Sequence, residues 1–101
     1  MKSFGDMVKQ AQKVQKKMTE LQDKLAEERF EASAGGGMVT AVVDGKQRLK
    51  ELKIDPEALK DSDVTLLEDL IVTAVGEAQR TSEEKMNQTI SQITGGFSMP
   101  F

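Results

Sequence analysis

The chain is 101 residues long, the length of one domain, carries a formal net charge of −3, and contains no Cys, His, Trp or Tyr. Without Cys and His it lacks thiol nucleophiles, disulfides, the commonest general base and the commonest transition-metal ligand, so we expect neither an enzyme with a small-molecule substrate nor a metal centre. The longest apolar runs, such as residues 70–72, are far too short to span a membrane, and no secretory segment is visible, so we expect a soluble cytoplasmic protein.

Charge is unevenly distributed along the chain. Residues 1–17 hold five lysines and one acid, whereas residues 55–69 hold six acids and one lysine. The distribution of charge matters more than its sum in deciding whether a surface attracts nucleic acid. The basic N-terminal segment is therefore the first place to look for a DNA-binding surface.

An amphipathic helix is predicted over residues 3–28. Its apolar side chains recur at alternating steps of three and four residues, which is the heptad spacing of a helix that packs along one seam. The seam consists of Phe4, Met7, Ala11, Val14, Met18, Leu21 and Leu25. At 1.5 Å per residue such a helix is roughly 39 Å long.

Three short antiparallel strands are predicted over residues 29–33, 38–44 and 47–54. The glycines at positions 35–37 separate the first two strands, because consecutive glycines favour a flexible turn. The Asp44-Gly45 pair is a strong signal for a two-residue hairpin between the second and third strands.

One face of this sheet is predicted to be apolar. The side chains expected on it are Val39, Ala41, Val43, Leu52 and Ile54. Leu49 does not share the parity of Leu52 and Ile54 along the strand. Either a bulge lies between them or Leu49 faces the other side of the sheet.

A short helical turn is predicted over residues 56–60, followed by a second long helix over residues 63–93. The glycines at 95 and 96 end this helix. Its apolar seam consists of Val64, Leu67, Ile71, Ala74, Ala78, Met86, Ile90 and Ile93. The tail at 95–101 either frays or docks through its three large apolar side chains.

The lengths of the two helices predict a homodimer. A compact domain of about 100 residues has a radius of gyration near 13 Å, so helices of roughly 40 Å must project beyond the sheet. Their apolar seams then stay half-covered in one chain, and a second copy would cover them. The residues expected in the core or the dimer interface are Met7, Val14, Met18, Leu21, Leu67, Ile71, Ala74 and Ala78.

A stripe of lysine and glutamine on the first helix is the candidate DNA-binding surface, and polar residues late in the second helix could form an opposite jaw. Lysine contacts phosphates, and glutamine can also read an adenine edge. The candidate residues are Lys9, Gln10, Gln12, Lys13, Lys16 and Lys17, with Arg80, Lys85 and Gln88 on the second helix. The absence of Trp and Tyr argues against stacking on single strands and favours double-stranded DNA. The alternative is a solvated coiled-coil flank of the same composition.

Other patterns have simpler structural explanations. The glycines at 35–37 lead into a strand rather than a helix, so they indicate a hairpin connection and not a phosphate loop. Asp61, Ser62 and Asp63 precede a helix, where acids and serine are ordinary capping residues, so no metal site is expected. Basic residues on the rim of the sheet are expected to protect an exposed edge strand from aggregation. They are Lys46, Arg48, Lys50 and Lys53.

Taken in order, several short segments resemble the YbaB/EbfC family of bacterial nucleoid-associated proteins. Each segment is weakly specific alone, and together they extend over essentially the whole chain. They are Met-Val-Lys-Gln-Ala-Gln at 7–12, the glycine-led strand and turn at 37–45, Leu-Lys-Ile-Asp-Pro at 52–56, Leu-Glu-Asp-Leu at 67–70, and Gly96-Phe97 with Met-Pro-Phe at 99–101.

This resemblance implies an α+β fold, a tweezer-like homodimer, no cofactor and a location at the nucleoid in the cytoplasm. It also implies binding to DNA with little or moderate sequence preference, a change in DNA conformation, and roles in nucleoid organisation and gene regulation. In this family the two long helices are implicated in DNA contact, and the resemblance implies that the contact here lies on the lysine and glutamine stripe and on the basic end of the second helix.

A prefoldin-like holdase, or another coiled-arm protein-interaction module, is the rival interpretation, because such proteins also carry projecting helical arms. A holdase grips unfolded chains by apolar arm tips. Solvent-facing Met86, Ile90 and Ile93 would favour the holdase, and burial of these side chains against a partner would favour the DNA-binding protein.

Overall fold

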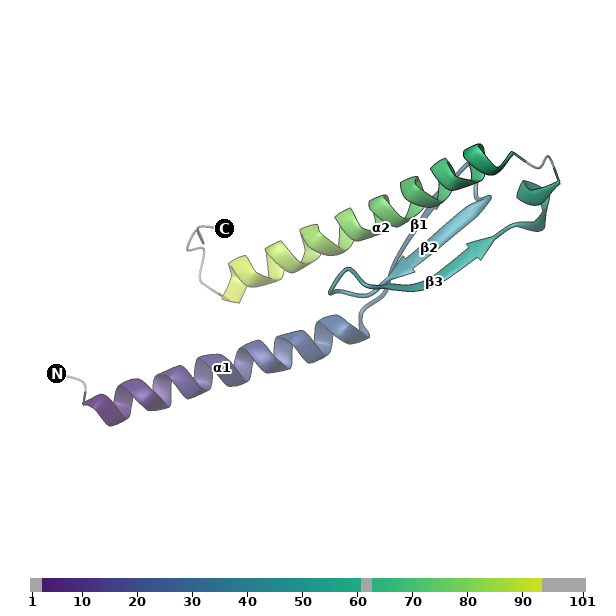
Figure 1. Cartoon of the computed structure of the whole chain (residues 1–101). Helices are drawn as coiled ribbons and strands as arrows, with labels where there is room; N and C mark the ends of the chain where they lie inside the picture. The colour runs from purple at the N-terminus through teal and green to yellow at the C-terminus, as the bar shows by residue number, and fades with distance from the viewer. Residues whose placement is uncertain (1–2, 61–62, 94–101) are drawn as a thin grey trace.

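The computed structural model describes residues 3–60 and 63–93 and has the predicted α+β order of elements (Figure 1). A long helix precedes three strands, a turn of 3₁₀ helix and a second long helix. The elements are α1 (Phe4–Glu27), β1 (Phe30–Ala34), β2 (Val39–Val43), β3 (Leu49–Ile54), η1 (Pro56–Leu59) and α2 (Val64–Ile93). The tail for which fraying or docking was predicted lies outside the described residues.

Helix α1 has a capping residue at its N-terminus and is mostly exposed along its length. Ser3 caps its N-terminus, where the hydroxyl oxygen accepts a hydrogen bond from the Asp6 amide at 3.2 Å. The helix ends at Glu27, and the next residue, Glu28, is already extended. Of the predicted seam only Leu21 and Leu25, near the C-terminal end, are buried within the chain.

The three strands form one antiparallel sheet in the order β1-β2-β3. A register shift places Glu51 opposite Val42 but Leu49 opposite Val43, so Lys50 is the extra residue of a β-bulge. The bulge answers the question that the sequence left open, because it returns Leu49 to the same face as Leu52. The predicted two-residue hairpin at Asp44-Gly45 is wrong: residues 44–48 form a longer loop.

Helix α2 packs across β1 and β2 and forms the core with them. Alanines on this helix allow a close approach to the sheet. The fully packed cluster is Ala34, Val39, Ala41, Val43, Ala74 and Ala78, with Leu67 and Ile71 partly buried against it. These positions were predicted as interior, apart from Ala34. Burial of apolar area here is the main source of stability.

The same helix leaves β3 uncovered, which corrects one expectation. Leu52 was predicted to be buried, but its side chain is 37% exposed, and Leu49 is 46% exposed. Ile54 is only half-buried. Because residues directly opposite one another share a face, these side chains point to the side of the sheet that α2 covers over β1 and β2. At Leu49 and Leu52 the third strand therefore presents an apolar strip that the described residues leave partly exposed.

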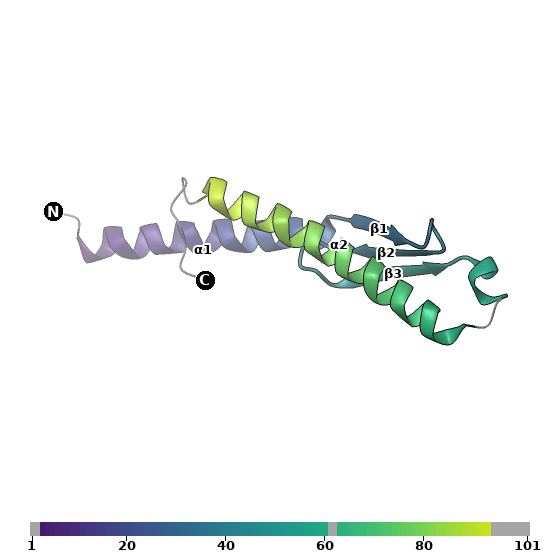
Figure 2. The same cartoon turned by 90° about the horizontal axis from the view of Figure 1, so that it is seen from above.

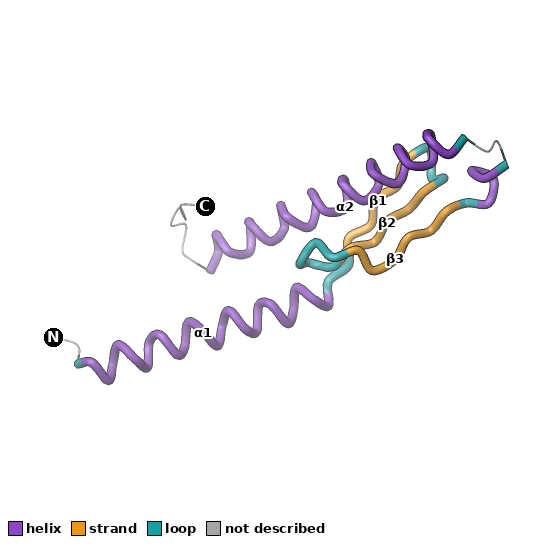
Figure 3. The backbone as a smooth tube through the Cα atoms, viewed as in Figure 1, coloured by secondary structure: helices purple, strands orange, loops and turns teal. Residues whose placement is uncertain are grey.

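The molecule is elongated, as the helix lengths predict. Its extents are 71 × 22 × 16 Å and its radius of gyration is 19.4 Å, against about 13 Å for a compact domain of this size. Helix α1 extends away from the sheet, and the C-terminal half of α2 projects in the same direction (Figures 2 and 3). Neither described helix combines the length and apolar character needed to cross a membrane.

Candidate nucleic-acid interface

The predicted lysine stripe lies on the exposed surface of the projecting helix α1. Lys9, Lys13, Lys16 and Lys17 are all exposed, as are Gln10 and Gln12. At about 100° per residue, the four lysines centre on a direction about 140° around the helix axis from the apolar seam. The two surfaces therefore lie on largely opposite sides of α1, with Lys17 at the edge of the stripe nearest the seam, so covering the seam leaves most of the stripe open.

The lysine stripe carries most of its positive charge unpaired. Within residues 3–60 and 63–93, none of its four lysines takes part in an ion pair. Asp6 is the nearest acid at the N-terminal end, where it borders a shallow hollow together with Lys9, Gln10 and Lys13. An unpaired ammonium on a convex, exposed helix is available to a phosphate without first giving up a carboxylate partner.

The predicted residues on α2 are arranged differently. The Arg80 guanidinium donates to the Glu77 carboxylate at 2.7 Å and to the Glu84 carboxylate at 3.0 Å. The hydrogen bond to Glu77, with the charges of Glu77 and Glu84, raises the pKa of Arg80 above its usual value. A phosphate would have to compete with two carboxylates for this side chain. Lys85 and Gln88 are exposed nearby.

A shallow cleft is lined by residues of both helices. It is lined by Lys17, Glu20, Leu21 and Lys24 from α1 and by Thr89 from α2. Lys24 was not among the predicted DNA-binding residues. It lies seven residues after Lys17 and so on the same side of the helix, a heptad step that could have identified it.

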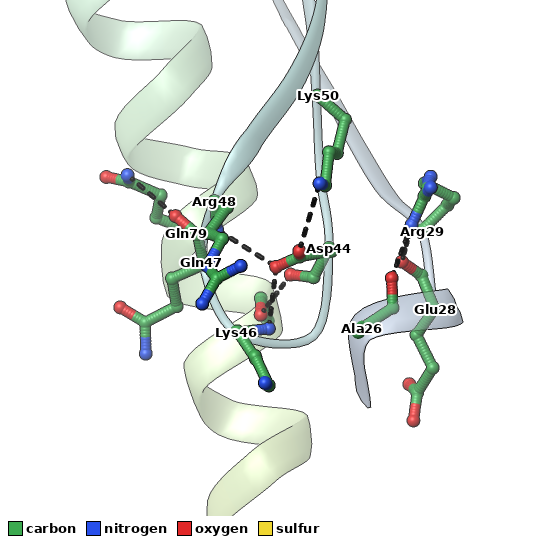
Figure 4. A network of polar contacts seen from close by, with 10 residues as sticks. Ala26, Glu28, Arg29, Asp44, Lys46, Gln47, Arg48, Lys50 and Gln79 are labelled. Carbon is green, nitrogen blue, oxygen red and sulfur yellow. Dashed lines mark hydrogen bonds and ion pairs between the residues drawn. The ribbon is translucent and has the colours of Figure 1, made fainter. Parts of the chain in front are cut away.

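A polar loop between β2 and β3, buried at Asp44 and Gly45, lies where the two arms leave the sheet (Figure 4). The side chain of Asp44 is fully buried and accepts hydrogen bonds from the Lys46 amide at 2.8 Å and the Arg48 amide at 3.0 Å. Burial raises the pKa of Asp44, but these amides, with the charges of Lys50 and Arg48, outweigh burial and leave the pKa below its usual value. Asp44 is therefore held as a carboxylate.

The other patterns singled out in the sequence have structural roles. Gly35, Gly36 and Gly37 all have positive φ and connect β1 to β2, as predicted. The Asp63 carboxylate accepts a hydrogen bond from the Leu66 amide at 3.0 Å, which is the predicted capping interaction at the start of α2. Within the part of the chain that the structure describes, no group of three or more acidic side chains could hold a metal ion.

Exposure of apolar side chains at the tip of α2 was the feature expected to distinguish a holdase from a DNA-binding protein. Met86 and Ile90 are half-buried in the single chain, so neither presents a fully solvent-facing apolar tip. The side chain of Ile93 lies outside what the structure describes. The part of the tip that is described therefore does not favour a holdase.

Comparison with known proteins gives a consistent result. Residues 1–97 match the sequence profile of the YbaB/EbfC DNA-binding family. A nucleoid-associated protein of Acetivibrio thermocellus is 48% identical over 93% of this chain and 83% of its own length. A nucleoid-associated protein of Gemmatimonas aurantiaca is 42% identical over 94% of this chain and 91% of its own length.

The fold is also similar to that of a solved structure. The crystal structure of an uncharacterized protein from Helicobacter pylori superposes with a TM-score of 0.84, covering 93% of this chain and 99% of the other. At 20% sequence identity, that likeness concerns the fold alone.

Proposed function

Because this chain belongs to the YbaB/EbfC DNA-binding family, we propose that it is a nucleoid-associated protein that binds double-stranded DNA as a homodimer and alters the conformation of the DNA. We place it at the nucleoid in the cytoplasm, acting as a single domain over residues 1–101. It works by binding and not by catalysis, and any effect on gene regulation follows from where it binds and how it shapes the DNA.

The observation that carries this proposal is the lysine stripe on a projecting helix. Four exposed lysines without ion-pair partners in the described residues follow one side of α1. Each lysine that neutralises a phosphate releases condensed counterions, so duplex binding gains entropy and falls with salt. Gln10 and Gln12 flank the lysines and add polar contacts to phosphate or to base edges. The acidic net charge is no obstacle, because the acids concentrate elsewhere in the chain.

A homodimer explains the two apolar surfaces that the described residues leave exposed. On α1 the seam residues Met7 and Val14 are 60% and 58% exposed, and Met18 is also exposed. On the sheet, Leu49 and Leu52 form the strip that α2 does not reach. Burial of such surface is worth about 25 cal/mol per Å², and stable interfaces bury at least roughly 1,200 Å² in total. A second copy of the chain is the natural cover for both.

Dimerisation through these surfaces supports DNA binding and does not compete with it. The seam and the lysine stripe lie on largely opposite sides of α1, so the paired chain covers apolar side chains and leaves most of the lysine stripe facing outward. Two copies would present two stiff, basic arms in a tweezer-like outline. Smooth bending of a 20–30 bp duplex costs about 1–6 kcal/mol, which a set of phosphate contacts on rigid arms can offset.

A duplex-DNA titration at two salt concentrations tests the proposal. The triple variant Lys9→Gln, Lys13→Gln and Lys16→Gln is compared with the wild type and with a matched control that removes the same charge elsewhere. The control changes are Lys46→Gln, Lys53→Gln and Lys60→Gln. We expect the wild type to bind with a steep salt dependence. Each phosphate that the stripe variant no longer neutralises should reduce the slope of log K against log salt by about 0.9.

Two outcomes would contradict the proposal in different ways. Equal reductions of affinity in the stripe variant and in the control would remove the assignment to α1 while leaving DNA binding in place. An absence of wild-type binding at low salt would overturn the DNA-binding function, and suppression of aggregation of an unfolded test protein would then become the assay to run.

A further inference from the structure

We propose that the loop at residues 44–48 is the positioning element that fixes arm α1 relative to arm α2. It is hydrogen-bonded to both helices, to Leu25 of α1 and to Gln79 and Ser82 of α2, and Figure 4 shows the loop beside α2. We call the loop together with its contacts on the two helices the arm junction. Its residues are Leu25, Asp44, Gly45, Gln47, Gln79 and Ser82. Its effect on DNA affinity rests on the function proposed above, whereas its effect on arm geometry does not.

The first half of the junction holds the end of α1. The Gly45 amide donates to the carbonyl oxygen of Leu25 at 2.7 Å, which is a hydrogen bond between the hairpin loop and the last turn of the helix. Among the described residues of α1, only Leu21 and Leu25 are buried, at 8% and 4% exposed. The connection from α1 to β1 is two residues of non-helical chain. The loop therefore contacts α1 at its last turn, whereas the helix is exposed at every residue before Leu21.

Position 45 has no room for a side chain. A Cβ at Gly45 would lie 2.6 Å from the Leu25 carbonyl oxygen, 2.9 Å from the Leu25 Cα and 2.9 Å from its Cδ2. Two of these atoms belong to the backbone of α1, so a methyl group at 45 can be accommodated only if the loop and the end of α1 move apart. The left-handed residue of the loop is Gln47, at φ 67°, and Gly45 does not have a positive φ. Glycine is thus required at 45 by contact with the arm and not by backbone conformation.

The second half of the junction holds α2. The Ser82 hydroxyl, fully buried, donates to the Asp44 carbonyl oxygen at 2.8 Å. One turn earlier, the Gln79 amide group donates to the Gln47 carbonyl oxygen at 3.1 Å. Both hydrogen bonds fix the loop to the helix immediately before α2 leaves the sheet. Buried hydrogen bonds of this kind are costly to leave unmade.

The loop between the two halves is stiff. The Asp44 carboxylate accepts the amides of Lys46 and Arg48, and the Asp44 amide donates to the Arg48 carbonyl oxygen at 2.9 Å. Its second carboxylate oxygen has no hydrogen bond among the described residues and faces the Lys50 ammonium at 3.8 Å. A carboxylate that closes its own loop makes the loop a rigid spacer between the arms.

Small changes at this spacer are amplified along the arm. Lys9 lies 16 residues before Leu25, or about 24 Å along α1. A tilt of about 10° at the junction therefore moves the lysine by about 4 Å, which is enough to break register with a phosphate at hydrogen-bonding distance. The lysine stripe depends on residues that do not themselves touch DNA.

Spin-label distances test this inference directly, since the chain has no native cysteine. Labels at Thr19→Cys on α1 and Glu83→Cys on α2 report the separation of the arms within one chain when doubly labelled chains are diluted into unlabelled ones. The test variant is Gly45→Ala. The matched control is Gly76→Ala on α2, where a new Cβ meets nothing within 4 Å.

Thr19 lies about 9 Å along α1 from Leu25, so we expect Gly45→Ala to shift the mean of the distance distribution by about 1.5 Å and to broaden it. DNA affinity should weaken by about tenfold, the effect of removing one or two phosphate interactions. Gly76→Ala should match the wild type in both. Ser82→Ala, which removes only a hydroxyl, should broaden the distribution more weakly. If Gly45→Ala does not fold, the Ser82→Ala distribution decides the question.

Wild-type distance distributions in Gly45→Ala, or in Ser82→Ala where the glycine variant cannot be made, would overturn the proposal. A shifted distribution with unchanged DNA affinity would overturn the claim that the junction serves binding. If the wild type itself does not bind DNA, the proposed function fails, yet the distances still decide whether loop 44–48 positions the arms.

Discussion

The two long helices each carry an apolar seam, but the fold covers these seams to very different extents. Helix α2 buries Ala74, Ala78 and Ser82 against the sheet and the loop, whereas α1 buries only its last apolar positions and exposes the rest of its seam. An apolar seam therefore indicates that a helix will be covered, but it does not say whether the cover comes from the same chain. The following predictions test this contrast.

A charge placed in the exposed α1 seam should have the largest effect. Val14→Asp is expected to raise the dissociation constant of the proposed homodimer by more than about 100-fold, because an unpaired carboxylate would be buried in the interface. Sedimentation equilibrium across a range of protein concentrations measures this. Gln12→Asp adds the same charge on the other side of the helix and should leave the dimer intact. Equal behaviour of the two variants would show that the seam is not the interface.

Removing side-chain volume from the core within one chain should lower stability by somewhat less free energy than Val14→Asp removes from dimer binding. Val43 is fully buried beneath α2, and Val43→Ala is expected to lower the free energy of unfolding by about 2 kcal/mol through reduced burial and a residual cavity. Urea denaturation followed by circular dichroism measures the change. Val72→Ala, on the exposed side of α2, should change stability by less than about 0.5 kcal/mol. Similar destabilisation in both variants would contradict the assigned core.

Acid should weaken the stabilising contribution of the Asp44 carboxylate in the loop that contacts both helices. Because the folded-state pKa of Asp44 is lowered, its contribution to stability is complete above its unfolded-state value of about 4 and is lost as the pH falls through the folded-state pKa. The difference in unfolding free energy between the wild type and Asp44→Asn should therefore shrink as the pH is lowered from 6 toward 3, as measured by urea titrations (pH values of about 6, 4 and 3). A difference independent of pH would contradict the role of the carboxylate.

The smallest effect is expected at Arg80 on α2. Because Glu77 and Glu84 already neutralise its guanidinium, Arg80→Gln should weaken duplex binding by no more than about twofold, less than any single lysine of the α1 stripe. The double change Glu77→Gln and Glu84→Gln frees the arginine and should strengthen binding at low salt. A titration in which Arg80→Gln costs more than Lys13→Gln would reverse the proposed ranking of the two arms.

The order of the elements was predictable because local periodicity carries it. The alternating three- and four-residue steps of α1 and the alternation in β2 are set by each element's own geometry, whatever it packs against. The pair of carboxylates around Arg80 was also predictable, since residues 77 and 84 lie three and four positions away on one helix face. What local spacing determines, sequence reasoning can recover.

Contacts between distant segments could not be recovered in the same way. The demand for glycine at 45 comes from Leu25, and the partner of Ser82 is 38 residues away in the chain. The bulge at Lys50 was one of two alternatives that the parity of Leu49 allowed. The exposure of Leu52 depends on how far α2 extends across the sheet, which no spacing within β3 specifies.

The opposite placement of the lysine stripe and the apolar seam on α1 has a consequence for exchange on the chromosome. Added salt screens the lysines, whereas burial of the seam does not depend on ionic attraction. The proposed complex should therefore dissociate from DNA as an intact dimer, without passing through separated chains. The amount of dimer bound to the nucleoid would therefore respond quickly and reversibly to the ionic conditions of the cell. The rate would be that of dimer release from DNA and not that of dimer assembly.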